Sequence, residues 1–232
     1  GKSLLVSTLE CYFQGKKELF KGLAIDELET EWKEYPVFRI DFNGKNFTEG
    51  SELLKTLTGF VEMQEAVYGK DPFHDTLGDR FCHVLKSAHE KTGQRAVVLI
   101  DEYDKPLLDV LDTGLETVVD GQKRKIEDWN REVLKGFYSV FKAADEHLQF
   151  VLLTGVTKFS QVSVFSGFNQ PDDISLSARY DTLLGVTEEE LHTVFKEQIK
   201  EMALEYELSE DEMKAKLKRQ FDGYHFSRRL KG

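Results

Sequence analysis

Residues 96–102 read Ala-Val-Val-Leu-Ile-Asp-Glu, and this stretch decides the fold. Five consecutive apolar residues, three of them β-branched, are typical of a parallel strand that is buried on both faces. The run ends in Asp101 and Glu102, and open α/β sheets bind their ligands at the carboxyl ends of the strands. The stretch therefore predicts an α/β fold with two carboxylates at the binding edge of its sheet.

A second short motif, Gly1-Lys2-Ser3, opens the chain. These residue types end a phosphate-binding loop, in which a Lys reaches the β- and γ-phosphates and the next hydroxyl binds Mg²⁺. Apolar residues at helical spacing follow over 3–13, and a helix N-terminus favours an anion. Neither motif is specific alone, but their order along the chain, with a helix between them, predicts a nucleotide site.

Strands and helices alternate through the first two thirds of the chain. This order predicts a doubly wound parallel sheet. Residues 107–128 form a long polar connection, which we interpret as a lid or insertion. We expect strands over 37–42, 96–100 and 150–153, and helices over 3–13, 52–67, 77–91 and 126–144.

The last third of the chain predicts mainly helices. Capping boxes at Thr187–Glu190 and Ser209–Glu212 start helices that we expect to end near Met202 and Phe221. Before them, residues 174–184 predict a short strand and a turn. We therefore expect a core domain over 1–186 and a small helical C-terminal subdomain over 187–232.

The composition of the chain argues against several classes of protein. The net charge is −11, from 42 acidic against 31 basic residues, which argues against direct nucleic-acid binding by this segment. No apolar stretch approaches the ~20 residues that a membrane-spanning helix needs. Cys11 and Cys82 are too few for a disulfide scaffold, and we interpret them as buried free thiols of a cytoplasmic protein.

The residue types of the two motifs suggest a division of roles. Lys2 would neutralise phosphate charge, Ser3 and Asp101 would bind Mg²⁺, and Glu102 would orient the attacking water. Thr154 ends the strand over 150–153, so it would lie beside Asp101 if those two strands are neighbours. There it would sense the γ-phosphate, or it would only satisfy its own turn.

Other interpretations of these residues stay open. Asp104 follows closely, so Asp101, Glu102 and Asp104 could together serve a metal-dependent nuclease. A solvated acidic turn without function is a third reading. Lys158 is a weaker sensor candidate, and Arg179 is a candidate arginine finger or a surface ion pair.

Segments along nearly the whole chain resemble the bacterial AAA-ATPase-like family. The first nine residues resemble its phosphate loop and first helix, and Val98–Leu107 resembles its acidic strand end. Similar matches follow in order at 153–160, 168–169, 173–176, 184–191 and 222–226.

The resemblance implies a P-loop NTPase fold, with ATP and Mg²⁺ as ligands. It carries roles over to Lys2, Ser3, Asp101 and Glu102, with Thr154 as sensor. It also implies a C-terminal nuclease-like domain of the PD-(D/E)XK type in the same parent protein. We expect the chain to couple ATP turnover to a conformational change, or to be a scaffold or signalling module that has lost hydrolysis.

Two departures from the family pattern matter. The chain starts at Gly1, inside the loop, so the central phosphate-loop strand is expected to be missing here, leaving a gap beside the Asp101 strand. Nucleotide binding by this chain alone could then be weak. In addition, Lys158 stands where family members often have Arg, and a Lys lacks the planar fork of a guanidinium.

Overall fold

A computed structural model describes residues 1–73, 75–156 and 171–221. The chain packs into two compact units, of which one is Lys2–Gln170 and the other is Pro171–Gly232 together with Gly1. The predicted domain boundary between 186 and 187 stays a prediction. None of the helices formed by the described residues combines the length and the apolar composition that a membrane crossing requires.

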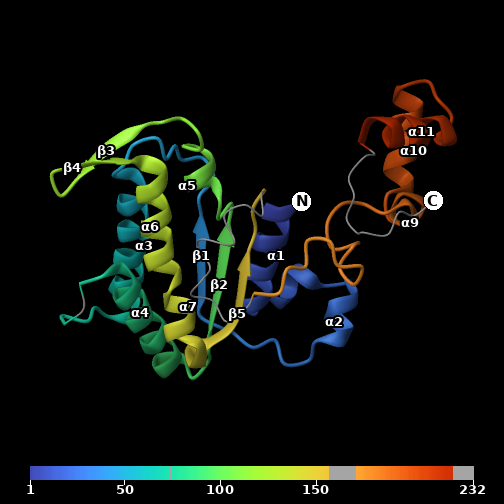
Figure 1. Ribbon diagram of the computed structural model, residues 1–232. Coiled ribbons are helices and arrows are strands. Elements are labelled where there is room, and N and C mark those ends of the chain that lie inside the picture. The colour runs from blue at the N-terminus through green and yellow to red at the C-terminus, as the bar shows by residue number, and fades with distance from the viewer. Residues whose placement is uncertain (74, 157–170, 222–232) are drawn as a thin grey trace. The chain divides into compact units, whose positions relative to one another are not determined.

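A parallel sheet forms the centre of the first unit. Its strands are β1 (Val37–Asp41), β2 (Ala96–Asp101) and β5 (Leu148–Leu153), in the order β1-β2-β5. The three strands run side by side with their carboxyl ends at one edge (Figure 1). This confirms the mixed α/β class and the parallel sheet.

One expectation about the sheet is wrong. Strand β2, which carries Asp101, pairs with β1 on one side and with β5 on the other. There is no gap beside β2, because β5 pairs with the edge of β2 that lies opposite β1. Whether a further strand precedes Gly1 stays a prediction.

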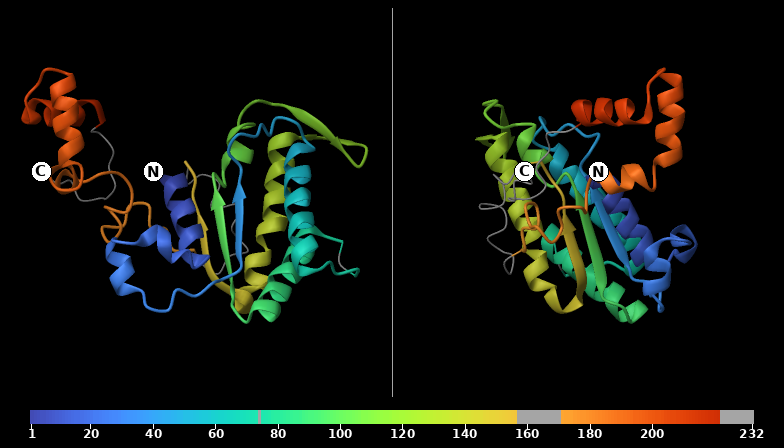
Figure 2. Two further views of the ribbon diagram at one scale, coloured as in Figure 1. Left: turned by 180° about the vertical axis from the view of Figure 1, so that it is seen from behind. Right: turned by 90° about the vertical axis from the view of Figure 1, so that its right-hand side faces the viewer.

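Helices cover both faces of the sheet (Figures 1 and 2). On one face, the β2 side chains Ala96, Val98 and Ile100 join the larger core. On the other face, Val97 and Leu99 pack with Val6 of the first helix. Alternate residues of β2 thus enter two cores, which is why the run over 96–100 is apolar throughout. The larger core is covered by α3 (Glu52–Tyr68), α4 (Leu77–Thr92), α6 (Ile126–Tyr138) and α7 (Val140–Ala143), and the smaller one by α1 (Lys2–Phe13).

The expected connection over 107–128 has structure of its own. After the short α5 (Lys105–Leu108), the strands β3 (Glu116–Val119) and β4 (Gln122–Lys125) form an antiparallel hairpin. Its turn is Asp120-Gly121, with both φ angles positive at 50° and 78°, as a two-residue hairpin turn requires. The hairpin packs closely on the body, because a Cβ at Gly50 would lie 2.2 Å from the Thr117 hydroxyl oxygen.

Three further segments differ from the expectation. The single helix predicted over 126–144 is divided into α6 and α7 at Ser139. In the second unit, the helix predicted over 187–202 is two helices, and the capping box at Thr187 is present at the start of the first. Residues 174–184 form turns and no strand. The remaining elements are η1 (Lys17–Phe20), α2 (Ala24–Leu28), η2 (Asp145–His147), α9 (Glu188–His192), α10 (Lys196–Glu205) and α11 (Glu210–Phe221).

An ion pair joins α3 to α4. The Arg80 guanidinium donates to both carboxylate oxygens of Glu65, at 2.8 and 2.7 Å, and Glu65 is buried. A Glu65→Ala variant is expected to destabilise the fold by about 3–5 kcal/mol, because it leaves the charged Arg80 side chain, which is only 11% exposed, without its partner. Urea unfolding measures this loss. Glu90→Ala is the control, since Glu90 pairs with Lys86 on the surface at 3.9 Å and should cost at most about 1 kcal/mol.

The same pair predicts a dependence of stability on pH. The hydrogen bonds from Arg80 lower the pKa of Glu65 below its ordinary value of 4.5. The ionised form therefore stabilises the fold, and this stabilisation is complete above the unfolded pKa. It is lost as the pH falls through the lower pKa of the folded state. Unfolding measured from pH 7 down to pH 3 should show this decline in the wild type and a smaller decline in Glu65→Ala.

Candidate nucleotide site

The candidate site lies at the carboxyl edge of the sheet. Strand β2 ends in Asp101, and Thr154 follows β5 directly. The two strand ends are held in register, because the Thr154 amide donates to the Ile100 carbonyl at 2.9 Å and the Tyr103 amide donates to the Thr154 carbonyl at 2.9 Å. The predicted neighbourhood of Asp101 and Thr154 is therefore formed by direct pairing of their strands.

Asp101 is fully buried at this edge. Its Oδ1 accepts a hydrogen bond from the Thr154 hydroxyl. Its Oδ2 is also buried and has no hydrogen-bond partner among the described residues. An unsatisfied buried carboxylate oxygen is costly, and a cation or a metal-bound water would satisfy it. This unsatisfied oxygen is the feature of the site that fits Mg²⁺ binding.

Lys2 approaches the same edge from the first turn of α1. Its Nζ donates to the Gly155 carbonyl at 2.9 Å and lies 3.8 Å from Oε1 of Glu102. The Lys2 side chain is one-third exposed, so its ammonium remains accessible to an incoming anion. A residue at the start of the chain thus meets residues that follow β2 and β5.

Glu102 has an unusual backbone conformation. Its φ is +57°, in the left-handed region that non-glycine residues rarely adopt. Such conformations cost of order 1–3 kcal/mol and occur preferentially at functional sites. The Glu102 side chain is 22% exposed, whereas the neighbouring Asp101 is completely covered. The two adjacent carboxylates therefore have different environments, one buried and one accessible.

The remaining predicted site residues are not all placed. Ser3 is exposed on the first turn of α1, and Gly1 precedes that helix. Lys158 lies outside the described residues. Arg179 belongs to the second unit, where its guanidinium carbon lies 5.5 Å from the centroid of the Tyr180 ring. The roles assigned to Gly1, Ser3, Lys158 and Arg179 stay predictions.

The carboxylates do not form a metal cage by themselves. Within the part of the chain that the structure describes, no group of three or more His, Cys, Asp and Glu side chains could hold a metal ion. Magnesium at nucleotide sites is usually bound by one or two protein groups together with phosphate oxygens and waters. Asp101, whose Oδ2 is unsatisfied, fits this type of metal site.

Two residues of this edge were not predicted to position the site. Asp104 is fully buried, and its Oδ2 accepts a hydrogen bond from the Val156 amide at 2.9 Å. Gly155 packs against Tyr103 and Asp104 so closely that a Cβ would lie 2.5 Å from the tyrosine ring. Neither contact has a local sequence signal, since each joins segments about fifty residues apart.

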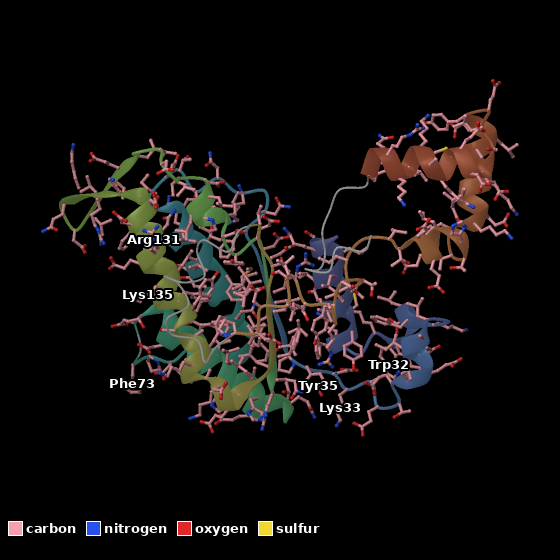
Figure 3. All side chains as sticks on the ribbon, turned by 45° about the vertical axis from the view of Figure 1, so that its right-hand side comes forward. Trp32, Lys33, Tyr35, Phe73, Arg131 and Lys135 are labelled. Carbon is pink, nitrogen blue, oxygen red and sulfur yellow. The ribbon has the colours of Figure 1, made fainter. Side chains whose placement is uncertain are left out.

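Two small cavities lie elsewhere in the first unit. Trp32, Lys33 and Tyr35, between α2 and β1, help to line one of them (Figure 3). The other lies where the β3–β4 hairpin meets the body, next to Lys125 and Gly114. Neither cavity is lined by Lys2, Asp101, Glu102 or Thr154. The candidate site is therefore identified by its contacts and not by a cavity.

The features of the fold and the site define a mixed α/β protein consistent with a P-loop-like fold. They are the parallel sheet, the helices on both of its faces, and the lysine and carboxylates at the ends of the strands. Comparison with known proteins assigns the family. Residues 1–165 match the AAA-ATPase-like family model, which is described as "Predicted AAA-ATPase". The chain belongs to this family, and the resemblance seen in its motifs is confirmed.

A curated relative is similar over most of the chain. It is a protein of Azotobacter chroococcum mcd 1 described as "Uncharacterized protein in vnfD 5'region", and it is 37% identical over 195 residues. The match covers 84% of this chain but only 36% of the relative. The chain thus spans about a third of the length of that relative. No solved structure matches the chain significantly.

Proposed function

We propose that this chain is an ATP-binding and ATP-hydrolysing P-loop domain that couples nucleotide turnover to conformational change. The observation that carries the proposal is the meeting of Lys2, Asp101, Glu102 and Thr154 at one sheet edge, from three separate elements. A lysine, a buried carboxylate, an accessible carboxylate and a hydroxyl are the groups that phosphoryl transfer to water requires. Membership of a family described as ATPases supports the same class.

Each residue has a distinct role in this proposal. Lys2 binds the β- and γ-phosphates, and Asp101 with Ser3 holds Mg²⁺. A bound magnesium ion would neutralise charge that develops on the phosphate oxygens. Glu102 orients a water toward the γ-phosphate and accepts its proton. Thr154 fixes Asp101 through their hydrogen bond, so that Oδ2 stays directed to the metal.

The contacts of Lys2 suggest a resting arrangement. Its ammonium is held by the Gly155 carbonyl and by Glu102. Phosphate binding would draw Lys2 away from both groups and leave the Glu102 carboxylate free to hold water. Since the Lys2–Glu102 distance is 3.8 Å and both side chains are partly exposed, this pair is weak and would yield readily to a phosphate.

Calorimetric titration of the full-length protein with ATP and Mg²⁺, followed by a phosphate-release assay, tests the proposal. We expect saturable binding that weakens when Mg²⁺ is removed, and phosphate release that depends on Mg²⁺. Bound nucleotide should also raise the melting temperature with increasing ATP concentration. Absence of both binding and thermal stabilisation would contradict the proposal.

Two alternatives predict different results. An inactive scaffold binds ATP without releasing phosphate. A nuclease that uses Asp101, Glu102 and Asp104 cleaves DNA in the presence of Mg²⁺. The bond from the Val156 amide to Asp104 does not favour the nuclease, because it engages a carboxylate that the nuclease would need for metal binding. A nuclease-like domain elsewhere in the same protein, and a cytoplasmic location, stay predictions.

A further inference from the structure

Asp104 is a buried carboxyl group that the proposed mechanism does not use. It follows β2 by three residues and has no solvent exposure. Although it precedes the short helix α5, its side chain makes no capping hydrogen bond to that helix. Instead, its Oδ2 accepts from the amide of Val156, in the segment that leaves β5. The Asp104 carboxylate therefore links the segments that follow two neighbouring strands, β2 and β5.

Two more contacts join the same pair of segments. The Tyr103 amide donates to the Thr154 carbonyl at 2.9 Å. Between Thr154 and Val156, Gly155 lies so close that a Cβ would be 2.5 Å from Cε1 of Tyr103 and 2.6 Å from Oδ1 of Asp104. Three consecutive residues after β5 are thus held against the turn that follows β2. We name residues 103–104 and 154–156 the exit clamp.

Two residues of the exit clamp make hydrogen bonds to residues of the candidate site. Thr154, at its first position, donates its hydroxyl to Asp101. Gly155, at its second position, offers the carbonyl that accepts from Lys2. The backbone orientation of the clamp therefore sets both the hydrogen bond that aligns Asp101 and the acceptor that positions Lys2 before nucleotide binds.

We propose that Asp104 and Gly155 are positioning residues, which hold Thr154 on Asp101 so that the metal-binding oxygen of Asp101 is correctly directed. This inference rests on the proposed ATPase function. It assigns a role to a carboxylate and a glycine that contact neither nucleotide nor metal. Small displacements of positioned groups cost up to about 100-fold in rate, so the clamp affects turnover more than binding.

Asp104→Ala in the full-length protein tests the proposal, with Asp109→Ala as its matched control. Asp109 lies five residues further along the chain and accepts from the Phe47 amide at 3.1 Å and from the Lys105 ammonium at 2.8 Å. Each variant removes one carboxylate that holds a backbone amide. We expect Asp104→Ala to lower kcat by about 10–100-fold with little change in the ATP dissociation constant. Asp109→Ala should leave kcat close to that of the wild type.

Two further variants separate positioning from general stability. Asp104→Asn keeps an oxygen acceptor for the Val156 amide, so it should restore most of the turnover that Asp104→Ala loses. Gly155→Ala disturbs the clamp from the opposite segment, because its methyl group fits only if the Tyr103 ring or the Asp104 carboxylate shifts. It should reproduce the loss of kcat. Equal losses of kcat in Asp104→Ala and Asp109→Ala, or no rescue by Asn, would overturn the proposal.

Amide hydrogen exchange gives a readout that does not depend on ATP hydrolysis. The Val156 amide should exchange slowly in the wild type and in Asp109→Ala, and much faster in Asp104→Ala. If the wild type neither binds nor hydrolyses ATP, the proposed function fails, yet this difference in exchange still reports the clamp. If Val156 exchanges equally in all three proteins, the clamp itself is wrong, whatever the ATPase result.

Discussion

Glu102→Gln is expected to reduce ATP hydrolysis by the full-length protein about 10²–10⁴-fold, while ATP binding is retained. A neutral amide cannot accept a proton from the attacking water, although it has nearly the same size as the carboxylate. The loss should therefore be in kcat. Phosphate release at saturating ATP measures it, and calorimetry on the same variant measures binding.

The structure indicates that this variant will still fold. Glu102 is partly exposed, and its contact with Lys2 is 3.8 Å long, so its loss should cost under about 1 kcal/mol. Glu116→Gln is the control, because Glu116 makes a pair of similar length, though more exposed, with Lys123 at 3.6 Å on the β3–β4 hairpin. The control should keep full turnover. Unchanged turnover in Glu102→Gln would show that Glu102 is not the catalytic base.

Lys2→Ala is expected to weaken ATP binding about 10–100-fold, because hydrogen bonds to charged groups contribute about 1.5–3 kcal/mol and each 1.4 kcal/mol is tenfold in affinity. Titration with ATP and Mg²⁺ measures the change in dissociation constant. Lys2→Arg keeps the charge but replaces a compact ammonium with a planar fork. We expect Lys2→Arg to bind ATP with intermediate affinity.

Loss of binding must be distinguished from loss of the fold. Without nucleotide, the melting temperature of Lys2→Ala should stay close to that of the wild type, because the Lys2 side chain is partly exposed. Only the wild type should then gain strongly in melting temperature when ATP is added. Lys17→Ala is the control for charge, since Lys17 forms an exposed pair with Asp26 at 4.0 Å. ATP affinity equal to that of the wild type in Lys2→Ala would contradict the phosphate role.

Several elements could be predicted because their signals are local. The apolar run at 96–100 predicted strand β2, and helical spacing after Lys2 predicted α1. The β3–β4 hairpin was missed although Asp120-Gly121 is a typical hairpin turn, because the strand Gln122–Lys125 is entirely polar. The break between α6 and α7 at Ser139 was also missed, since the apolar spacing continues across it.

Long-range pairing explains the other differences. The sequence could place Thr154 at a strand end, but only the pairing of β5 with β2 brings its hydroxyl to Asp101. The same pairing removes the gap expected beside β2. Asp104 was considered as a nuclease ligand because it follows Asp101 and Glu102 closely, and no local pattern indicates that it accepts from the Val156 amide. The roles assigned to Arg179 and Lys158 stay predictions.

The sequence by itself determined the α/β class and the buried strand that carries Asp101 and Glu102. These follow from residue types and spacings within short windows, where side-chain periodicity records burial. The family was indicated by the resemblance of the chain's motifs to those of known members. Only the tertiary structure decided the strand order, the approach of Lys2 to Glu102 and Gly155, and the exit clamp. Those contacts join residues that are distant along the chain, and the folding of the whole sheet brings them together.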